Sequence, residues 1–321
     1  MSHVRAARKR LLTAAMPICL ALTALLSAGT IAAAELPDDQ RPIECGSCAG
    51  WNAGQAPFRL HGESWYVGVR GLSTVLIDTG AGLVLIDGGL PQSAEPIIAS
   101  IEALGFAIAE VKWILNSHAH FDHAGGIAAL ARISGAQVLA SPDGAAGLRA
   151  GAALEGDPQA AFGEEMRFPP VSDVQEIADR EPLTLGGLTL TPHFTPGHMP
   201  GGTTWTWRAC EANQCLSMVY ADSLNAVSAP GYAFSAEGDR PAKRLRDSID
   251  RVRALDCDIL VPAHPDFGGL YERLERGQAA GAAHPLVDRD ACRVYADTAE
   301  TRLAARLEQE RSAAATDSGA H

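Results

Sequence analysis

The 321-residue sequence lacks the motifs of several common enzyme classes. It contains neither S-x-x-K nor G-x-S-x-G, the two signatures of a serine acyl-enzyme. It also has no Walker loop and no G-x-G-x-x-G fingerprint, which argues against nucleotide chemistry. Only one C-x-x-C occurs, at Cys45 and Cys48. This pair could be redox-active or half of a zinc site, but without a second C-x-x-C a structural disulfide is favoured.

Basic residues are scarce, and four of them lie in the first ten positions, where there is no acid. An apolar run and the small residues at positions 32–34 follow, which predicts a signal peptide over residues 1–34. Pro17 interrupts the apolar run and argues against a retained membrane anchor. The residues before Cys19 do not resemble a lipobox. We therefore expect an exported protein, with the periplasm as the favoured location.

The mature chain is strongly acidic. Cleavage after Ala34 leaves 22 basic against 38 acidic residues and moves the formal charge from −12 to −16. No basic stripe remains that could follow phosphates, so nucleic acid is excluded as a partner. With 47% apolar and 20% charged residues the chain can bury a large core. We predict one domain over residues 35–313, made of one large unit or two merged halves, and a flexible tail over residues 314–321.

Six cysteines remain after the leader is removed, an even number that predicts disulfides in an exported chain. Proximity in the sequence suggests Cys45 with Cys48 and Cys210 with Cys215. The remaining pair would then be Cys257 with Cys292, although six cysteines permit fifteen connectivities.

Apolar runs typical of strands alternate with amphipathic, helix-like segments. Strands are predicted over residues 65–69, 73–78, 83–87, 111–116, 183–194, 203–207, 216–221 and 258–264, and helices over 93–104, 123–133, 241–255 and 290–311. Residues 141–180 show broken periodicity, which indicates one or two short helices and a mobile loop. The order fits an α/β fold of two halves packed sheet to sheet, with helices outside.

One stretch concentrates side chains that bind metals. Residues 116–126 read NSHAHFDHAGG, with His118, His120, Asp122 and His123 directly after a predicted strand. Burying so many polar groups without a partner would cost several kcal/mol, on the order of 2–7 for each group. A cation would satisfy them together. This cluster is placed in a strand-to-helix loop.

Two further histidines follow predicted strands, His198 in TPGHMPGG and His264 in PAHPD. Six ligands suit two zinc ions, because Zn²⁺ accepts imidazole and carboxylate at about 2.0–2.2 Å and keeps a position open for water in catalytic sites. The expected sets are His118, His120 and His198 for one ion, and Asp122, His123 and His264 for the other.

The other candidates have weaker signals. His61, His193 and His284 have no motif around them and are taken as ordinary surface or core residues. Asp87, which closes a strand before two glycines, could orient the metal loop or simply cap a turn. Asp222 in YADSLN could bridge the metals, accept a hydrogen bond from a ligand, or shape a turn; the second role is favoured.

These motifs together resemble the metallo-β-lactamase superfamily, over roughly residues 51–292. The intact His118 and the serine at position 223 are similar to the third subclass of class B β-lactamases. The resemblance implies an αββα sandwich of two mixed sheets flanked by helices, with a dinuclear zinc site. It also implies that Ser223 and Asn225 lie near the substrate carboxylate, although Asn225 replaces an expected hydroxyl residue. Trp51 and residues 141–166 would form walls of the pocket.

The expected activity is hydrolysis of the β-lactam amide, the basis of antibiotic resistance, by a metal-bound hydroxide. Asp122 would orient that hydroxide or relay its proton. One alternative is another exported hydrolase of the same fold, either a lactonase or a thioesterase. A second is a zinc-binding module without catalytic activity. The sequence does not determine which β-lactams are preferred or the oligomeric state.

Overall fold

The computed structural model describes residues 36–318, so the predicted signal peptide and the last three residues lie outside the described part of the chain. The described residues form two mixed β-sheets. The first contains, in spatial order, β1 (Phe58–His61), β2 (Ser64–Tyr66), β3 (Val75–Asp78), β4 (Leu83–Ile86), β5 (Val111–Leu115), β6 (Gln137–Ala140) and β7 (Val174–Glu176). The second contains β12 (Ile259–Pro262), β11 (Gln214–Ala221), β10 (Thr203–Glu211), β9 (Leu188–Phe194) and β8 (Leu183–Leu185).

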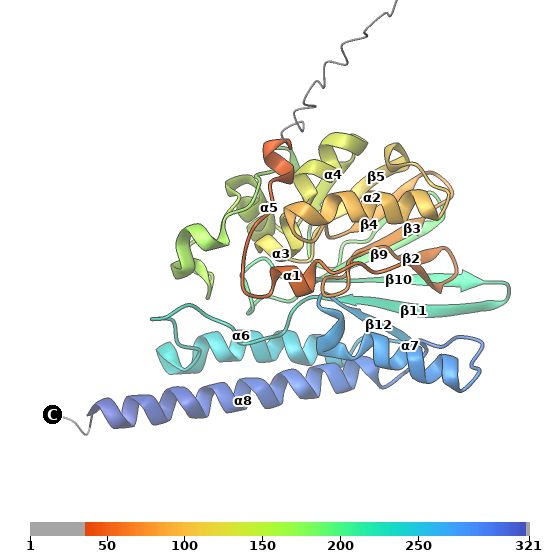
Figure 1. The fold of residues 1–321 in the computed structure, drawn as a ribbon. Helices are drawn as coiled ribbons and strands as arrows, with labels where there is room; N and C mark the ends of the chain where they lie inside the picture. The colour runs from red at the N-terminus through yellow and green to blue at the C-terminus, as the bar shows by residue number, and fades with distance from the viewer. Residues whose placement is uncertain (1–35, 319–321) are drawn as a thin grey trace, which may run out of the picture. The chain divides into compact units, whose positions relative to one another are not determined.

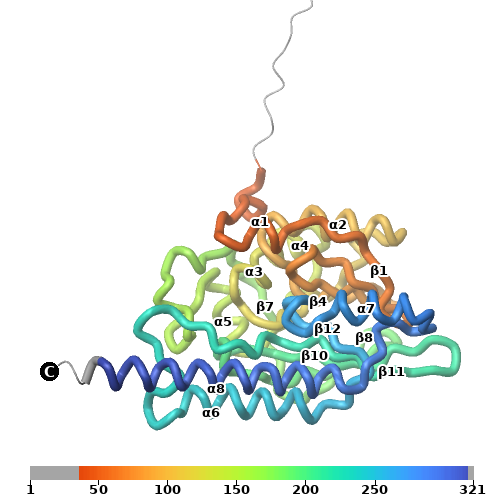
Figure 2. Tube along the Cα trace, turned by 60° about the horizontal axis from the view of Figure 1, so that its bottom comes forward, coloured from red at the N-terminus to blue at the C-terminus, as the bar shows by residue number. Residues whose placement is uncertain are grey.

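Helices lie on the outer side of each sheet (Figure 1). The α-helices are α1 (Cys48–Trp51), α2 (Ala94–Ala103), α3 (Phe121–Ala124), α4 (Ile127–Ser134), α5 (Pro142–Ala150), α6 (Ala236–Arg253), α7 (Leu270–Ala279) and α8 (Ala291–Ser318). Short 3₁₀ turns are η1 (Asp38–Gln40), η2 (Pro91–Ser93), η3 (Ile108–Glu110), η4 (Ala160–Met166) and η5 (Pro265–Gly268). Helices α2, α4 and α5 cover the first sheet, while α6 and α8 cover the second, and Figure 2 shows α8 running along α6.

Three apolar clusters account for this layering. The inner cluster joins the facing sides of the two sheets and includes Tyr66, Trp205 and Tyr220. A second cluster packs the outer face of the first sheet against α2, α4 and α5. A third packs β11 and β12 against α6 and α8. Each sheet is therefore buried on both faces, which explains why β4 and β12 are uninterrupted apolar runs. The predicted αββα sandwich is confirmed.

Most predicted elements are present, but several differ. Strands β1 and β6 and helix α7 were not predicted, and β7 lies inside the segment taken as a mobile loop. The metal cluster is only partly in a loop, because Asp122 and His123 belong to the short helix α3. The regular part of α6 begins near Pro241, as predicted, since residues 237–239 have positive φ. Helix α8 continues to Ser318, so residues 314–318 of the expected tail are helical.

The three suggested disulfides are all present: Cys45–Cys48, Cys210–Cys215 and Cys257–Cys292. The C-x-x-C pair is therefore a disulfide rather than half of a zinc site. None of the helices within residues 36–318 has both the length and the apolar composition that a bilayer crossing requires.

Candidate metal centre

The histidines of the motif meet those from two distant loops. His118, His120 and His198 are all buried, and one ligand nitrogen of each lies within 4.8 Å of the others. The ring centroids of each pair are 4.9 Å apart. Strand β5 leads into the first two residues, and the turn after β9 supplies the third. The structure therefore brings together the first predicted ligand set.

The second predicted set lies beside the first. Ligand atoms of His118, Asp122 and His123 are within 4.8 Å of one another. His264, which follows β12, places its Nε2 3.1 Å from Nε2 of His123 and 3.3 Å from Oδ2 of Asp122. Its side chain is 11% exposed, so it lies at the open edge of the cluster. All six predicted ligands thus converge on one buried region.

Each histidine of the first set has an oxygen atom close to its outer nitrogen. Nδ1 of His118 is 2.8 Å from Oδ1 of Asp222, and Nδ1 of His198 donates to the carbonyl oxygen of Asn225 at 2.9 Å. Nε2 of His120 is 2.8 Å from Oδ2 of Asp157. Such contacts fix the tautomer and the ring orientation of metal-binding histidines. They leave His118 Nε2, His120 Nδ1 and His198 Nε2 facing inward.

The inward-facing nitrogens fit a cation. Nε2 of His118 is buried and has no hydrogen-bond partner within the described residues. Nε2 of Gln159 lies 3.4 Å from His120 Nδ1 and 3.5 Å from His198 Nε2, so an amide N–H group faces the lone pairs that an ion would use. Neutral imidazole and carboxylate are the ligands of zinc and related transition metals. The residues present therefore fit a metal site.

Burial shapes the protonation of the cluster. It lowers the pKa of His118 well below its usual value, and burial followed by the charge of His120 lowers the pKa of His198 to about 3. Burial also lowers the pKa of His264. These imidazoles are neutral at pH 7, the form that binds metals. Burial opposes a charge on His123 as well, but the carboxylate of Asp122 raises the pKa of His123 to about 10. A metal ion must displace this proton.

Asp87 anchors the loop that carries the cluster. It is fully buried at the end of β4 and has a φ of 61°. Its Oδ1 accepts from the backbone N–H of Ser117 at 2.6 Å and from Nδ2 of Asn116 at 3.2 Å. Its Oδ2 accepts from the Ser117 hydroxyl at 2.5 Å and from the Tyr220 hydroxyl at 2.8 Å. A turn-capping role alone would not require four buried donors.

The segment after β11 carries the two expected substrate-contacting residues. Ser223 is buried, and its hydroxyl has no hydrogen-bond partner in the described chain. The side-chain oxygen of Asn225 accepts from Nη1 of Arg302 on α8 at 3.0 Å. Further along α8, Arg306 donates to Ser228 Oγ at 2.8 Å, and Glu310 accepts from the backbone N–H groups of residues 234 and 235. Helix α8 therefore holds this segment in place.

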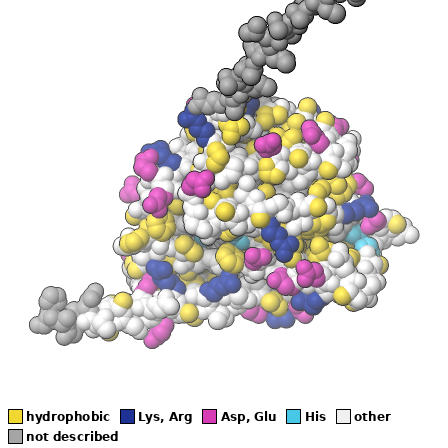
Figure 3. Space-filling view, in the orientation of Figure 1, with side chains coloured by type: hydrophobic (Ala, Val, Ile, Leu, Met, Phe, Trp, Pro, Cys, Tyr) yellow, Lys and Arg dark blue, Asp and Glu magenta, His cyan; other side chains and the backbone are white. Residues whose placement is uncertain are grey.

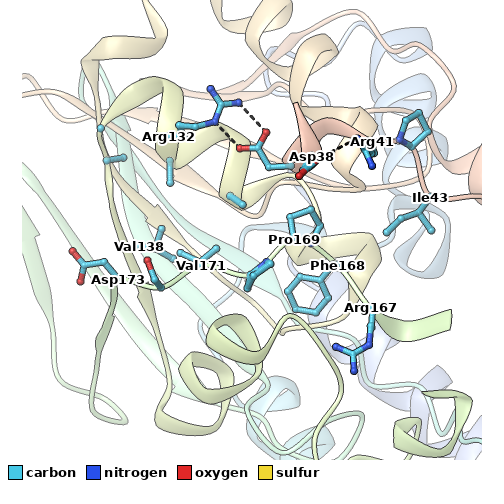
Figure 4. Close-up of a pocket in the computed structure, with 18 residues that line it drawn as sticks. Asp38, Arg41, Ile43, Arg132, Val138, Arg167, Phe168, Pro169, Val171 and Asp173 are labelled. Carbon is cyan, nitrogen blue, oxygen red and sulfur yellow. Dashed lines mark hydrogen bonds and ion pairs between the residues drawn. The ribbon is translucent and has the colours of Figure 1, made fainter. Parts of the chain in front are cut away.

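A pocket of about 680 Å³ borders the cluster. Its lining includes Trp51, Phe121, Gln159, Phe162 and Met166, so Trp51 and part of residues 141–166 form walls as expected. The ring of Trp51 lies 5.3 Å from that of His264, centroid to centroid. A second cavity, of about 820 Å³, lies between η1, α4 and residues 167–173 (Figure 4). Of the two pockets, the first is the one beside the metal cluster, because Gln159 in its lining faces His120 and His198 and Trp51 packs on His264.

Sequence reasoning missed Asp157 and Gln159. Both are buried and contact the cluster, yet they lie in a segment with no motif and no regular periodicity. The only signal was the acidic, loop-like composition of that segment. Asp222 lies behind His118, with its Oδ1 2.8 Å from Nδ1, but this oxygen accepts no hydrogen bond within residues 36–318, so its role as an acceptor stays a prediction.

Comparison with known proteins agrees with this geometry. Residues 67–205 match the model of the metallo-beta-lactamase superfamily. The chain is 50% identical to the solved Rm3 metallo-beta-lactamase, covering 84% of this chain and 99% of that one, with a TM-score of 0.79. It is 49% identical to MEM-A1, a subclass B3 metallo-beta-lactamase from a soil metagenome library, with coverages of 82% and 99% and a TM-score of 0.78. A hydroxyacylglutathione hydrolase of Anaeromyxobacter dehalogenans is 35% identical over 65% of this chain and 73% of its own length.

The chain therefore belongs to the metallo-β-lactamase superfamily, a class of metal-dependent hydrolases. Within that superfamily, two of its solved relatives, MEM-A1 and a metallo-β-lactamase with an active-site glutamic acid, are subclass B3 enzymes, the subclass that the resemblance of the motifs implied.

Proposed function

We propose that the protein hydrolyses the amide bond of β-lactam rings with two zinc ions. His118, His120 and His198 would hold one ion, and Asp122, His123 and His264 the other. The observation that carries the proposal is the convergence of both ligand sets in one buried cluster, on a chain that is 50% identical to Rm3 over nearly the whole of that enzyme.

Bound zinc lowers the pKa of water from 15.7 to about 7 and polarises a carbonyl oxygen. The residues of this chain orient the metal ligands and the attacking water. Asp157 and the carbonyl oxygen of Asn225 orient the imidazoles of His120 and His198, and the ring of Trp51 packs beside that of His264. The pKa of the Asp122 carboxyl lies well below its usual value: burial opposes this shift, and His123 and His264 more than offset it. Asp122 is therefore an anion that can accept a hydrogen bond from the attacking water and orient it.

Ser223 and Asn225 are proposed to bind the substrate carboxylate. The Ser223 hydroxyl is available because nothing in residues 36–318 bonds it. Because Arg302 occupies the side-chain oxygen of Asn225, the amide Nδ2 remains as a donor toward a carboxylate. Asparagine thus supplies the donor that a hydroxyl would supply in the third subclass.

The mature protein is proposed to be exported. Three disulfides among the described residues support this, because such bonds persist mainly in oxidising compartments. The predicted leader lies outside the described residues.

Purified protein should open a chromogenic cephalosporin, lose this activity to a chelator and regain it with zinc. A second candidate function is thioester hydrolysis, which the 35% identity to a hydroxyacylglutathione hydrolase favours. The same preparation should therefore also be assayed with a glutathione thioester. Faster turnover of the thioester than of the cephalosporin would contradict the β-lactamase proposal.

A further inference from the structure

Three metal-binding side chains also meet outside the catalytic cluster. They are His61 at the end of β1, Glu211 at the end of β10, and His284 between α7 and α8. One ligand atom of each lies within 4.8 Å of the others. The two imidazole rings are edge to face with centroids 4.9 Å apart, and Nδ1 of His61 is 3.8 Å from Oε2 of Glu211. None of the three belongs to either ligand set of the proposed catalytic site.

His61 has an unsatisfied nitrogen that points into this group. The residue is 2% exposed, and its Nδ1 is buried with no hydrogen-bond partner in the described part of the chain. Its other nitrogen, Nε2, faces the carbonyl oxygen of Gln214 at 3.4 Å. A proton on Nε2 leaves a lone pair on Nδ1 directed at Glu211 and His284. Leaving a buried polar atom unpaired costs about 1–3 kcal/mol, which a bound cation would remove.

The surrounding backbone holds the ligands in place. The disulfide Cys210–Cys215 closes the hairpin just before Glu211. Gly62 packs so closely on this strand that a Cβ atom there would lie 2.8 Å from the carbonyl oxygen of Cys210. Arg59 binds Oε1 of Glu211 at 3.2 Å, which leaves Oε2 toward His61. On the face drawn in Figure 3, histidine side chains reach the surface beside the β10–β11 hairpin, where an ion could enter from solvent.

We propose that His61, Glu211 and His284 form an additional site for a divalent transition-metal ion, with Zn²⁺ as the ion to test. Two imidazoles and one carboxylate match the ligand chemistry of zinc, and the partly exposed Glu211 leaves a fourth position for water. The ion would fasten together β1, the β10–β11 hairpin and the loop between α7 and α8. This role is separate from hydrolysis.

The test is zinc content per chain after equilibrium dialysis against micromolar Zn²⁺, measured together with cephalosporin turnover. His284→Ala and Glu211→Gln are suitable variants because neither side chain is fully buried, whereas a change at His61 could prevent folding. The control is His193→Ala, since the ring of His193 bonds Thr206 on the neighbouring strand and lies outside the group.

Each of the two variants should bind one zinc ion fewer than the wild type and the His193→Ala control, with turnover unchanged. Equal zinc content in all four proteins would overturn the proposal. Loss of an ion together with loss of turnover would also overturn it, because the missing ion would then be catalytic. The zinc count can be read even if the protein proves inactive on β-lactams, so failure of the proposed function is distinguishable.

Discussion

The carboxylate of Asp87 should determine both the stability of the fold and its affinity for metal. Asp87→Ala removes the acceptor for four donors, from Ser117, Asn116 and Tyr220, at a position that is fully buried. Tyr220 also donates to the carbonyl oxygen of Ser73, and Asn116 to that of His118, so these two side chains keep a partner. The backbone N–H of Ser117 has no other acceptor within residues 36–318.

The magnitude follows from these partners. A buried donor left unsatisfied costs about 1–3 kcal/mol, and a hydrogen bond to a charged acceptor contributes about 1.5–3 kcal/mol. Asp87→Ala should therefore lower the free energy of unfolding by about 4 kcal/mol. Asp87→Asn keeps one side-chain oxygen and should lower it by about 2 kcal/mol. Because the loop from Asn116 carries the motif, zinc affinity should also fall roughly 10-fold to 100-fold.

Urea denaturation followed by tryptophan fluorescence measures the first effect, and competition with a chromogenic chelator measures the second. Asp78→Asn is a matched control, because Asp78 ends the neighbouring strand and accepts one exposed bond, from the N–H of Gly80. The control should change stability by no more than about 0.5 kcal/mol. If Asp87→Ala were as stable as the control, the anchoring role argued from the four contacts would be wrong.

Three further outcomes are expected. His264→Ala should reduce cephalosporin turnover by more than about 100-fold, since it removes a proposed ligand, and assays at increasing zinc concentration should show partial recovery. Asp157→Asn should weaken zinc binding by about 10-fold, because His120 loses a charged acceptor, and chelator competition would detect this. Asp179 forms an ion pair with Arg251 at 2.7 Å. Burial alone would raise the pKa of the Asp179 carboxyl, but a backbone N–H and the Arg251 guanidinium lower it below its usual value. The stabilisation relative to Asp179→Asn should be at most about 1 kcal/mol at pH 7, because solvent screens this partly exposed pair. It is present above the unfolded pKa of the carboxyl and should be lost as the pH falls through the lower folded pKa. A gap in urea midpoints that stays constant down to pH 3 would contradict this reasoning.

The ligand residues were accessible to sequence reasoning because each follows an apolar run. His118, His198 and His264 come shortly after β5, β9 and β12, whose composition identifies them as buried strands. Strand ends in layered α/β folds meet along one edge, so the convergence could be argued before any coordinates.

Other features depend on long-range contacts that no local pattern encodes. Asp157 reaches His120 from a segment without periodicity, and Arg302 reaches Asn225 from 77 positions away. Helix α7 was missed because its sequence is mostly polar, with three buried residues among ten. His61 and His284 lack any motif, and their proximity arises only when the β10–β11 hairpin and the loop between α7 and α8 pack against β1.

Helix α8 has a consequence for the order in which activity is acquired. Arg302 and Glu310 lie almost at the end of the described chain, yet they fix the segment that carries Ser223 and Asn225. A ribosome makes every proposed metal ligand before it makes these two residues. A nascent chain therefore contains all its proposed metal ligands before the edge that would hold the substrate can be fixed, which happens only when the final helix docks.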